Sequence, residues 1–221
     1  MATIRTQTVE SAGDPTDEFL VGEVLLGDVD AFSMLMRRYN QKLYRIVRGI
    51  TGDDASAEDA IQQAYLSAYR YLGQLRGQAR FGAWLKRIAV REALRARREA
   101  AQLRELRQDT AHAQVIAFPS PPEQRLAARE WVRLVETAID ELPDAYRAVL
   151  VMRKVEHLST EETAELLGVS SENVRVRLFR ARKLLSDRLY DRAGDALDEL
   201  YEFGGERCGR IVAQVLAQLR L

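Results

Sequence analysis

The chain has 221 residues, 47% of them hydrophobic and 30% charged, and a formal net charge of zero, which supports packed cores and excludes wholesale disorder. No run approaches the roughly 20 apolar residues that cross a bilayer, and the start lacks a signal segment, so we expect a cytoplasmic protein without membrane insertion. One cysteine and two isolated histidines make neither an internal disulfide nor a metal-ligand spacing, so we expect no cofactor.

Charge is segregated along this neutral chain. Seven acids and no base lie between Thr6 and Met36. Nine bases face three acids from Arg80 to Arg107, and seven face three from Ser171 to Arg192. Two basic blocks are typical of polyanion binding at two surfaces, although two solvated helix faces would give the same pattern.

Residues 56–72 predict an amphipathic helix that begins at a cap formed by Ser56 and Asp59. Its core stripe has helical spacing and consists of Ile61, Tyr65, Ala68 and Leu72. The opposite face carries Asp59, Gln63, Leu66 and Arg70, with Gln62 at its edge. A leucine among polar groups indicates either a small docking patch or a scattered surface apolar residue.

A glycine-rich, arginine-bearing loop from Gly73 to Arg80 leads into the next predicted helix, which begins at Phe81. We expect its core stripe to be Phe81, Leu85, Ile88, Ala89 and Ala96. Four arginines project from the other side, Arg87, Arg91, Arg95 and Arg98, with Trp84 at the margin. Aromatic rings beside guanidinium groups suit unstacked bases, although Trp84 could equally be a core tryptophan.

The helical pattern breaks at DTAHAQVIAFPSPP, residues 109–122, where three prolines in four residues exclude a helix. We interpret this stretch as an interdomain linker. The sequence thus predicts an all-α chain of two small helical domains joined by a flexible linker, the second a helix-turn-helix domain, with a C-terminal helical tail. The proposed divisions are an acidic segment 1–15, a first domain 16–107, a linker 108–122, a second domain 123–190 and an extension 191–221.

The stretch LSTEETAELLGVSSENVRVRLFRARKLL, residues 158–185, predicts the helix-turn-helix. Ser159 and Glu162 form a capping box, Gly168 suits the left-handed residue that ends a helix, and Ser170 caps a second helix running to about Leu189. Ala164, Gly168 and Val174 provide the small contact, the turn and the apolar residue facing back that two crossing helices require. A plain helical hairpin is the alternative.

On the second helix, Val174, Leu178, Ala181 and Leu185 fall on one side and form the core stripe. The opposite face carries Glu172, Val176, Phe179, Arg180 and Lys183, flanked by Arg175, Arg177 and Arg182. A partner protein could cover Val176 and Phe179, but a DNA major groove also explains the surrounding cations. The first helix is acidic, through Glu161, Glu162 and Glu165, so we expect this face to meet solvent or a protein rather than phosphate.

The tail ends in a predicted amphipathic helix from Cys208 to Leu221, with Ile211, Val212, Val215, Leu216 and Leu219 on its apolar side. Three roles are open for it: docking on the second domain, binding a regulatory protein, or pairing with another chain. Its acidic lead-in could also compete with DNA for the basic recognition helix. We expect Cys208 to be a buried small apolar residue rather than a redox sensor.

Residues 16–190 resemble bacterial σ factors of the extracytoplasmic-function (ECF) subfamily. The N-terminal domain of σ factors is similar to DAFSMLMRRYNQKLYRIVRGITGD, AEDAIQQAYLSAYR and FGAWLKRIAVREALRARR. Their C-terminal, −35-binding domain is similar to LPDAYRAVLVMRKVEHLSTEETAELLGVSSENVRVRLFRARKLL. The presence of these two domains alone is the ECF layout.

The resemblance implies partners and site residues. It implies binding to core RNA polymerase, at the β′ clamp helices and the β flap, to promoter DNA, and to an anti-σ factor. The polymerase-binding residues would be Asp59, Gln62, Gln63 and Leu66, although relatives usually carry an acid where Gln63 stands. The −35 element would be read by Glu172, Arg175, Val176, Phe179, Arg180 and Lys183. The −10 element would be bound and melted by Arg80, Trp84, Arg87, Arg91, Arg95 and Arg98, and many relatives carry asparagine where Arg91 stands.

We therefore expect a σ factor that gives RNA polymerase its promoter choice. The alternative is an ordinary helix-turn-helix regulator that binds duplex operators without polymerase, usually as a symmetric dimer. The basic, aromatic stretch 73–107 argues against that alternative. An enzyme is not expected, because the sequence shows no nucleophile–base pair, phosphate-binding glycine loop or metal cluster.

Overall fold

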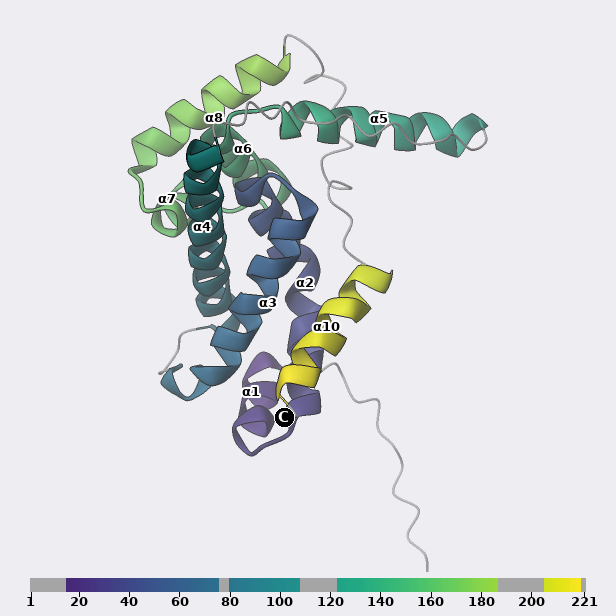
Figure 1. Cartoon of the computed structure of the whole chain (residues 1–221), viewed down its shortest axis with the longest axis vertical. Coiled ribbons are helices and arrows are strands. Elements are labelled where there is room, and N and C mark those ends of the chain that lie inside the picture. The colour runs from purple at the N-terminus through teal and green to yellow at the C-terminus, as the bar shows by residue number, and fades with distance from the viewer. Residues whose placement is uncertain (1–14, 76–79, 108–122, 187–204, 220–221) are drawn as a thin grey trace, which may run out of the picture.

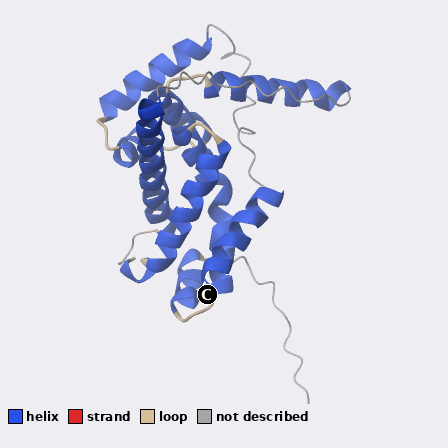
Figure 2. Ribbon diagram, in the orientation of Figure 1, coloured by secondary structure: helices blue, strands red, loops and turns tan. Residues whose placement is uncertain are grey.

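The computed structural model describes residues 15–75, 80–107, 123–186 and 205–219. Within these ranges every regular element is a helix and no strand occurs, as Figure 2 shows. The all-α prediction is therefore confirmed for this part of the chain. The proline-containing stretch interpreted as a linker lies outside the described residues, as does the end predicted for the second helix of the helix-turn-helix, near Leu189.

Over residues 15–75 and 80–107, the first domain contains four α-helices and a short 3₁₀ turn. They are α1 (Asp17–Leu25), α2 (Val29–Thr51), α3 (Asp54–Arg70), η1 (Leu72–Gln74) and α4 (Phe81–Arg107). Helices α2, α3 and α4 pack on one another, and α1 covers one end of α2 (Figure 1).

The start of α3 differs from the prediction. Gly52 ends α2 with a φ of 92°, and Asp53 follows at once as the cap of α3, its Oδ1 accepting a hydrogen bond of 2.8 Å from the backbone N–H of Ser56. The predicted cap at Ser56 is therefore wrong. An aspartate caps as well as a serine, and the glycine turn places Asp53 at the first position able to do so.

The core of the first domain follows the predicted stripes. Ile61, Tyr65 and Ala68 of α3 are all buried, and so is Leu72 at the start of η1. Helix α4 contacts both α2 and α3, so its buried side differs in part from the predicted stripe. Its buried residues are Phe81, Leu85, Ala89, Val90 and Ala93, whereas the predicted core residues Ile88 and Ala96 are only half-buried.

The second domain consists of α5 (Glu123–Asp140), α6 (Asp144–Leu150), a π-helical turn η2 (Val151–Val155), α7 (Thr160–Leu167) and α8 (Ser171–Ser186). The predicted local signals of the helix-turn-helix are confirmed. Ser159 and Glu162 form the capping box, Gly168 ends α7 with a φ of 65°, and Ser170 Oγ accepts a hydrogen bond of 3.1 Å from the backbone N–H of Asn173. Ala164 and Val174 meet Val149 of α6 in a small buried cluster.

The two domains are packed together through α2 and α6. Arg147 of α6 is 4% exposed, and its Nε donates a hydrogen bond of 3.1 Å to the carbonyl of Gly49. A Cβ at Gly49 would lie 3.0 Å from that of Val151, so any larger residue there would require η2 to shift by a few tenths of an ångström. The arrangement is thus a specific interface rather than a loose contact.

Helix α10 (Gly205–Leu219) lies along α2 and α3 of the first domain, where Figure 1 shows it in yellow. None of the three roles considered for the tail included docking on the first domain. Of the predicted apolar residues, Ile211, Val212 and Val215 are buried, and Leu216 and Leu219 are half-buried. Cys208 is half-buried rather than fully buried.

Candidate nucleic-acid interface

Helix α8 presents one apolar side to the core and one mixed side to solvent. Val174, Ala181 and Leu185 are buried, as predicted, and Leu178 is half-buried. On the other side, Val176 is 39% exposed and Phe179 is 69% exposed. The remaining predicted residues of this face, Glu172, Arg175, Arg180 and Lys183, are exposed as well. The sequence thus placed all six −35 candidates on the open face of one helix.

Two polar contacts orient the arginines of this face. Arg175 Nη1 lies 3.2 Å from Glu172 Oε2, one turn away on the same helix. Arg180 Nη1 donates a hydrogen bond of 3.2 Å to the hydroxyl of Tyr146 on α6. Tyr146 was not among the predicted site residues, and nothing in the local sequence indicates that α6 would reach this face.

The surface between α6 and α8 is hollowed. A cavity of about 540 Å³ is lined by Ala145, Tyr146, Ser170, Glu172, Asn173, Val176, Arg177 and Arg180. Guanidinium donors therefore lie beside exposed apolar carbons, a combination that can contact both phosphates and the edges of bases in a major groove.

Helix α4 presents a second basic face. The five predicted arginines, Arg80, Arg87, Arg91, Arg95 and Arg98, are all exposed. Arg95 is ion-paired within the helix, with Glu92 at 2.9 Å and Glu99 at 3.7 Å. Trp84 is half-buried against Phe81, with ring centroids 6.1 Å apart, so it contributes to the core while part of its side chain stays accessible. Residues 76–79 of the preceding loop lie outside the described residues.

The acidic side of α7 faces the basic side of α4. Arg87 is ion-paired with Glu165, and both side chains are more than half exposed. The pKa of Glu162 is lowered, chiefly because its carboxylate accepts a hydrogen bond from the backbone N–H of Ser159, and Lys86 of α4 adds an attraction. The acidic face of α7 is therefore in contact with the chain's own first domain while it stays largely exposed.

The outer face of α3 contains the third predicted set. Asp59 and Gln63 are exposed, and Gln62 and Leu66 are half-buried. Gln62 Nε2 donates a hydrogen bond of 2.6 Å to Gln214 Oε1 on α10. Sequence reasoning recognised the face but could not show that a helix about 150 residues later in the chain reaches its edge.

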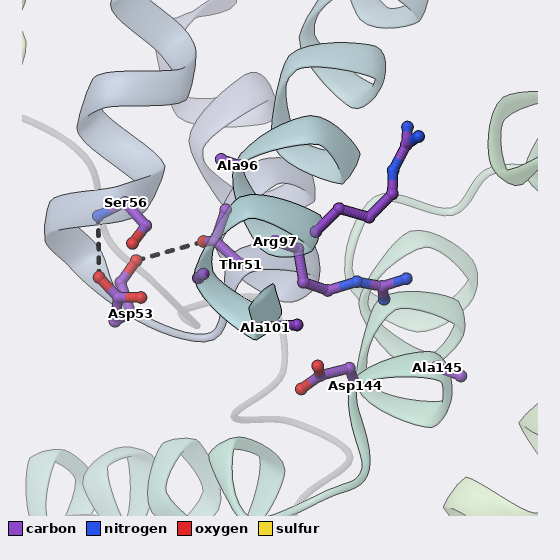
Figure 3. A pocket seen from close by; sticks show the side chains of 10 residues that line it. Thr51, Asp53, Ser56, Ala96, Arg97, Ala101, Asp144 and Ala145 are labelled. Carbon is purple, nitrogen blue, oxygen red and sulfur yellow. Dashed lines mark hydrogen bonds between the residues drawn. The ribbon is translucent and has the colours of Figure 1, made fainter. Parts of the chain in front are cut away.

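A further cavity of about 370 Å³ lies where α4 passes the ends of α2 and α6, and Figure 3 shows it. Arg97 of α4 points into it, and Asp53 and Asp144 lie on its wall. Among the residues predicted to bind DNA or polymerase, only Arg98 lines this cavity. Residues of both domains line this cavity, so it lies at their junction.

The described ranges contain neither a candidate metal site nor a candidate membrane-spanning helix. No group of three or more histidine, cysteine, aspartate or glutamate residues is placed there so that it could hold a metal ion. None of the helices described combines the length and apolar character needed to cross a bilayer.

Comparisons with known proteins match the segments that contain α4 and α8 to two regions of one protein family. Residues 35–102 match the model for sigma-70 region 2, and residues 133–185 match the model for sigma-70, region 4. The chain is 32% identical to the ECF RNA polymerase sigma-E factor of Haemophilus influenzae over 182 residues, which are 79% of this chain and 95% of that protein. It is 29% identical to the ECF RNA polymerase sigma factor SigW of Bacillus subtilis over 178 residues, 77% of this chain and 95% of that protein.

Solved structures show the same fold. The sigma factor RpoE bound to the anti-sigma factor NepR from Bartonella quintana is similar with a TM-score of 0.57 and 18% identity, over 72% of this chain and 96% of that chain. CnrH, in complex with the cytosolic domain of CnrY, is similar with a TM-score of 0.51 and 24% identity, over 77% of this chain and 95% of that chain. The chain therefore belongs to the ECF sigma factors of the sigma-70 family, which direct the initiation of transcription.

Proposed function

We propose that this sigma factor, which is not itself an enzyme, reads the −35 element with the exposed face of α8. The single observation that carries the proposal is the exposure of Val176 and Phe179 among arginines on an otherwise amphipathic helix. Burying such side chains against thymine methyl groups is favourable, and the arginines beside them can donate to guanine edges or phosphates. The matches to both region 2 and region 4 of sigma-70 argue against the alternative of an ordinary helix-turn-helix regulator.

The basic face of α4 is the proposed −10 surface. Arg87, Arg91 and Arg98 lie at helical spacing and are exposed, and the half-buried Trp84 lies at the margin of this face. Extruding a base from the duplex costs a few kcal/mol, which stacking and phosphate contacts can offset. Glu165 is ion-paired with Arg87, so this pair has to break before Arg87 can bind a DNA phosphate.

The outer face of α3 is the proposed docking site for the β′ clamp helices of core RNA polymerase. Asp59 and Gln63 are exposed there, beside the half-buried Leu66. An anti-sigma protein is the proposed regulator, and its support is the relative whose solved structure contains the anti-sigma factor NepR.

Fluorescence anisotropy with a labelled promoter duplex tests this function. The parent chain, an Asp59→Ala variant and a matched Glu161→Ala control are each measured with and without core polymerase. We expect tight promoter binding only with polymerase, weakened by Asp59→Ala and unchanged by Glu161→Ala. Tight binding of a palindromic duplex by the chain alone, as a symmetric dimer, would instead support the ordinary regulator.

A further inference from the structure

We infer that the face shared by α2 and α3 is a binding site for an amphipathic helix, and that α10 occupies it in cis and thereby competes with core polymerase. The identity of the competitor rests on the proposed function, because α3 carries the proposed polymerase-docking residues. The site itself rests on contacts within this chain alone.

The apolar side of α10 is buried on the first domain. Ile211 is 0% exposed, Val215 1% and Val212 3%, and all three belong to the same hydrophobic cluster as Ile61 and Tyr65 of the first domain. Spacings of one and four residues place them on one side of a helix, as expected for a helix lying in a groove. The tail helix therefore packs as an integral part of the first domain's surface.

Polar contacts fix the register of α10 at three points along this face. Arg210 Nη2 lies 3.1 Å from both carboxylate oxygens of Glu58. Asn40 Nδ2 donates to Cys208 Sγ at 3.0 Å, and Gln62 Nε2 donates to Gln214 Oε1 at 2.6 Å. A side-on apolar contact alone would tolerate sliding, whereas these pairs specify one position of the helix.

The position of α10 makes it an obstacle to a partner on α3. At 100° per residue, Glu58, Gln62 and Leu66 follow one another around α3 in steps of about 40°. Glu58 and Gln62 both contact α10, and Leu66 is the next residue around, within the proposed docking patch. A polymerase helix lying on Asp59, Gln62 and Leu66 would meet α10 at this edge, so one partner has to leave before the other can bind.

The apparent affinity for polymerase depends on the fraction of molecules in which α10 is undocked. If α10 is docked in roughly 90–99% of molecules, the apparent affinity for a competing partner falls about 10- to 100-fold. Releasing α10 should therefore tighten polymerase binding by about that factor, with no change in the residues that touch polymerase.

The test uses the full chain with Ile211→Asp, which places a charge on the buried side of α10, and Ala217→Asp, a matched control on its exposed side. Arg210→Glu is a second, milder variant that leaves every apolar contact intact and repels Glu58. Two quantities are measured: the affinity for core polymerase, and the rate at which a maleimide labels Cys208, the chain's only cysteine. Labelling reports undocking because Cys208 is half-buried against Asn40.

We expect Ile211→Asp and Arg210→Glu to bind core polymerase about tenfold or more tightly than the parent, and Ala217→Asp to match the parent. Both variants should also label faster, and core polymerase should speed labelling of the parent. Unchanged or weaker polymerase binding, together with faster labelling, would overturn the competition. Equal labelling of all four chains would overturn the docked helix. If no chain binds polymerase, the proposed function fails and the competition with it, while labelling still decides whether the groove holds α10.

Discussion

Arg48 of α2 and Asp140 at the end of α5 form a two-pronged ion pair between the two domains. Nη1 lies 2.9 Å from Oδ1, and Nη2 lies 2.7 Å from Oδ2. The Nε of the same arginine donates to Asp54 Oδ1 at 2.7 Å, so one guanidinium joins α2, α3 and α5. The fork geometry of arginine suits such paired carboxylates, and the side chain of Arg48 is only 10% exposed. This contact holds together two domains that the proposed function requires to act at separate promoter elements.

Replacing Arg48 by alanine should destabilise the chain by about 1–3 kcal/mol, because partly buried carboxylates lose their charge-assisted donors. Urea unfolding followed by circular dichroism measures the loss. Arg95→Ala is the matched control, since Arg95 is paired with two acids on an exposed helix face, and it should cost less than about 1 kcal/mol. Equal losses in the two variants would show that the interdomain pair has no special role.

Phe179→Ala should weaken binding of the polymerase-bound chain to a −35 duplex by about 1–2 kcal/mol, because an exposed aromatic ring would lose its burial against DNA. Its effect on unfolding should stay within about 0.5 kcal/mol, since the ring is 69% exposed. Leu184→Ala, which removes a 47% exposed side chain elsewhere on α8, should alter neither quantity. A loss of stability without a loss of DNA affinity would place Phe179 in a protein contact instead.

Arg175→Ala should cost about 1–3 kcal/mol of discrimination between −35 sequences if its guanidinium makes a bidentate contact with a base. Arg175→Lys keeps the charge but not the fork, so it should retain most of the general DNA affinity and lose the same discrimination. Competition binding against single-base variants of the −35 element gives both numbers. Discrimination retained by both variants would assign Arg175 to the phosphate backbone.

Glu156 predicts a dependence of stability on pH. Burial raises the pKa of its carboxyl group above the usual range, although Arg45, Lys42 and His157 act in the opposite direction. Its side chain is 3% exposed and lies 3.5 Å from Arg45 Nη1. Because the folded state holds the proton to higher pH than the unfolded state, the contribution of Glu156 is present at low pH and lost as pH rises through its raised pKa.

A Glu156→Gln variant stays neutral, so its stability relative to the parent should increase from about pH 5 to about pH 8. Urea unfolding of both chains at these two pH values measures the difference. A relative stability that stays constant or falls over this range would mean that the ion pair with Arg45 outweighs the burial of the charge.

Local signals explain most of what the sequence could predict. The turn of the helix-turn-helix depends on Ser159, Glu162, Gly168 and Ser170, and each of them acts within four residues of its own position. The buried stripe of α3 follows from a period of 3.6 residues, which any amphipathic helix must satisfy. The exposed face of α8 then follows by exclusion, because its opposite face is committed to the core.

The contacts that sequence reasoning missed join distant parts of the chain. Arg48 and Asp140 are separated by 92 residues, and Arg87 and Glu165 by 78. No periodicity shows which arginine of a basic face meets which acid of another domain. The docking of α10 was missed for the same reason, since an amphipathic helix indicates that it needs a partner but not where that partner lies. The cap at Asp53 is the exception, a local feature in which two residues three positions apart, Asp53 and Ser56, were both able to cap.

The most direct test of the account is run-off transcription by core polymerase reconstituted with this chain on a promoter library randomised at the −35 and −10 elements. We predict transcripts only in the presence of the chain, from templates enriched for one pair of elements, and a changed −35 preference with Arg175→Ala. Transcription that never depends on the chain, or enrichment that is the same when residues of α8 are substituted, would contradict it.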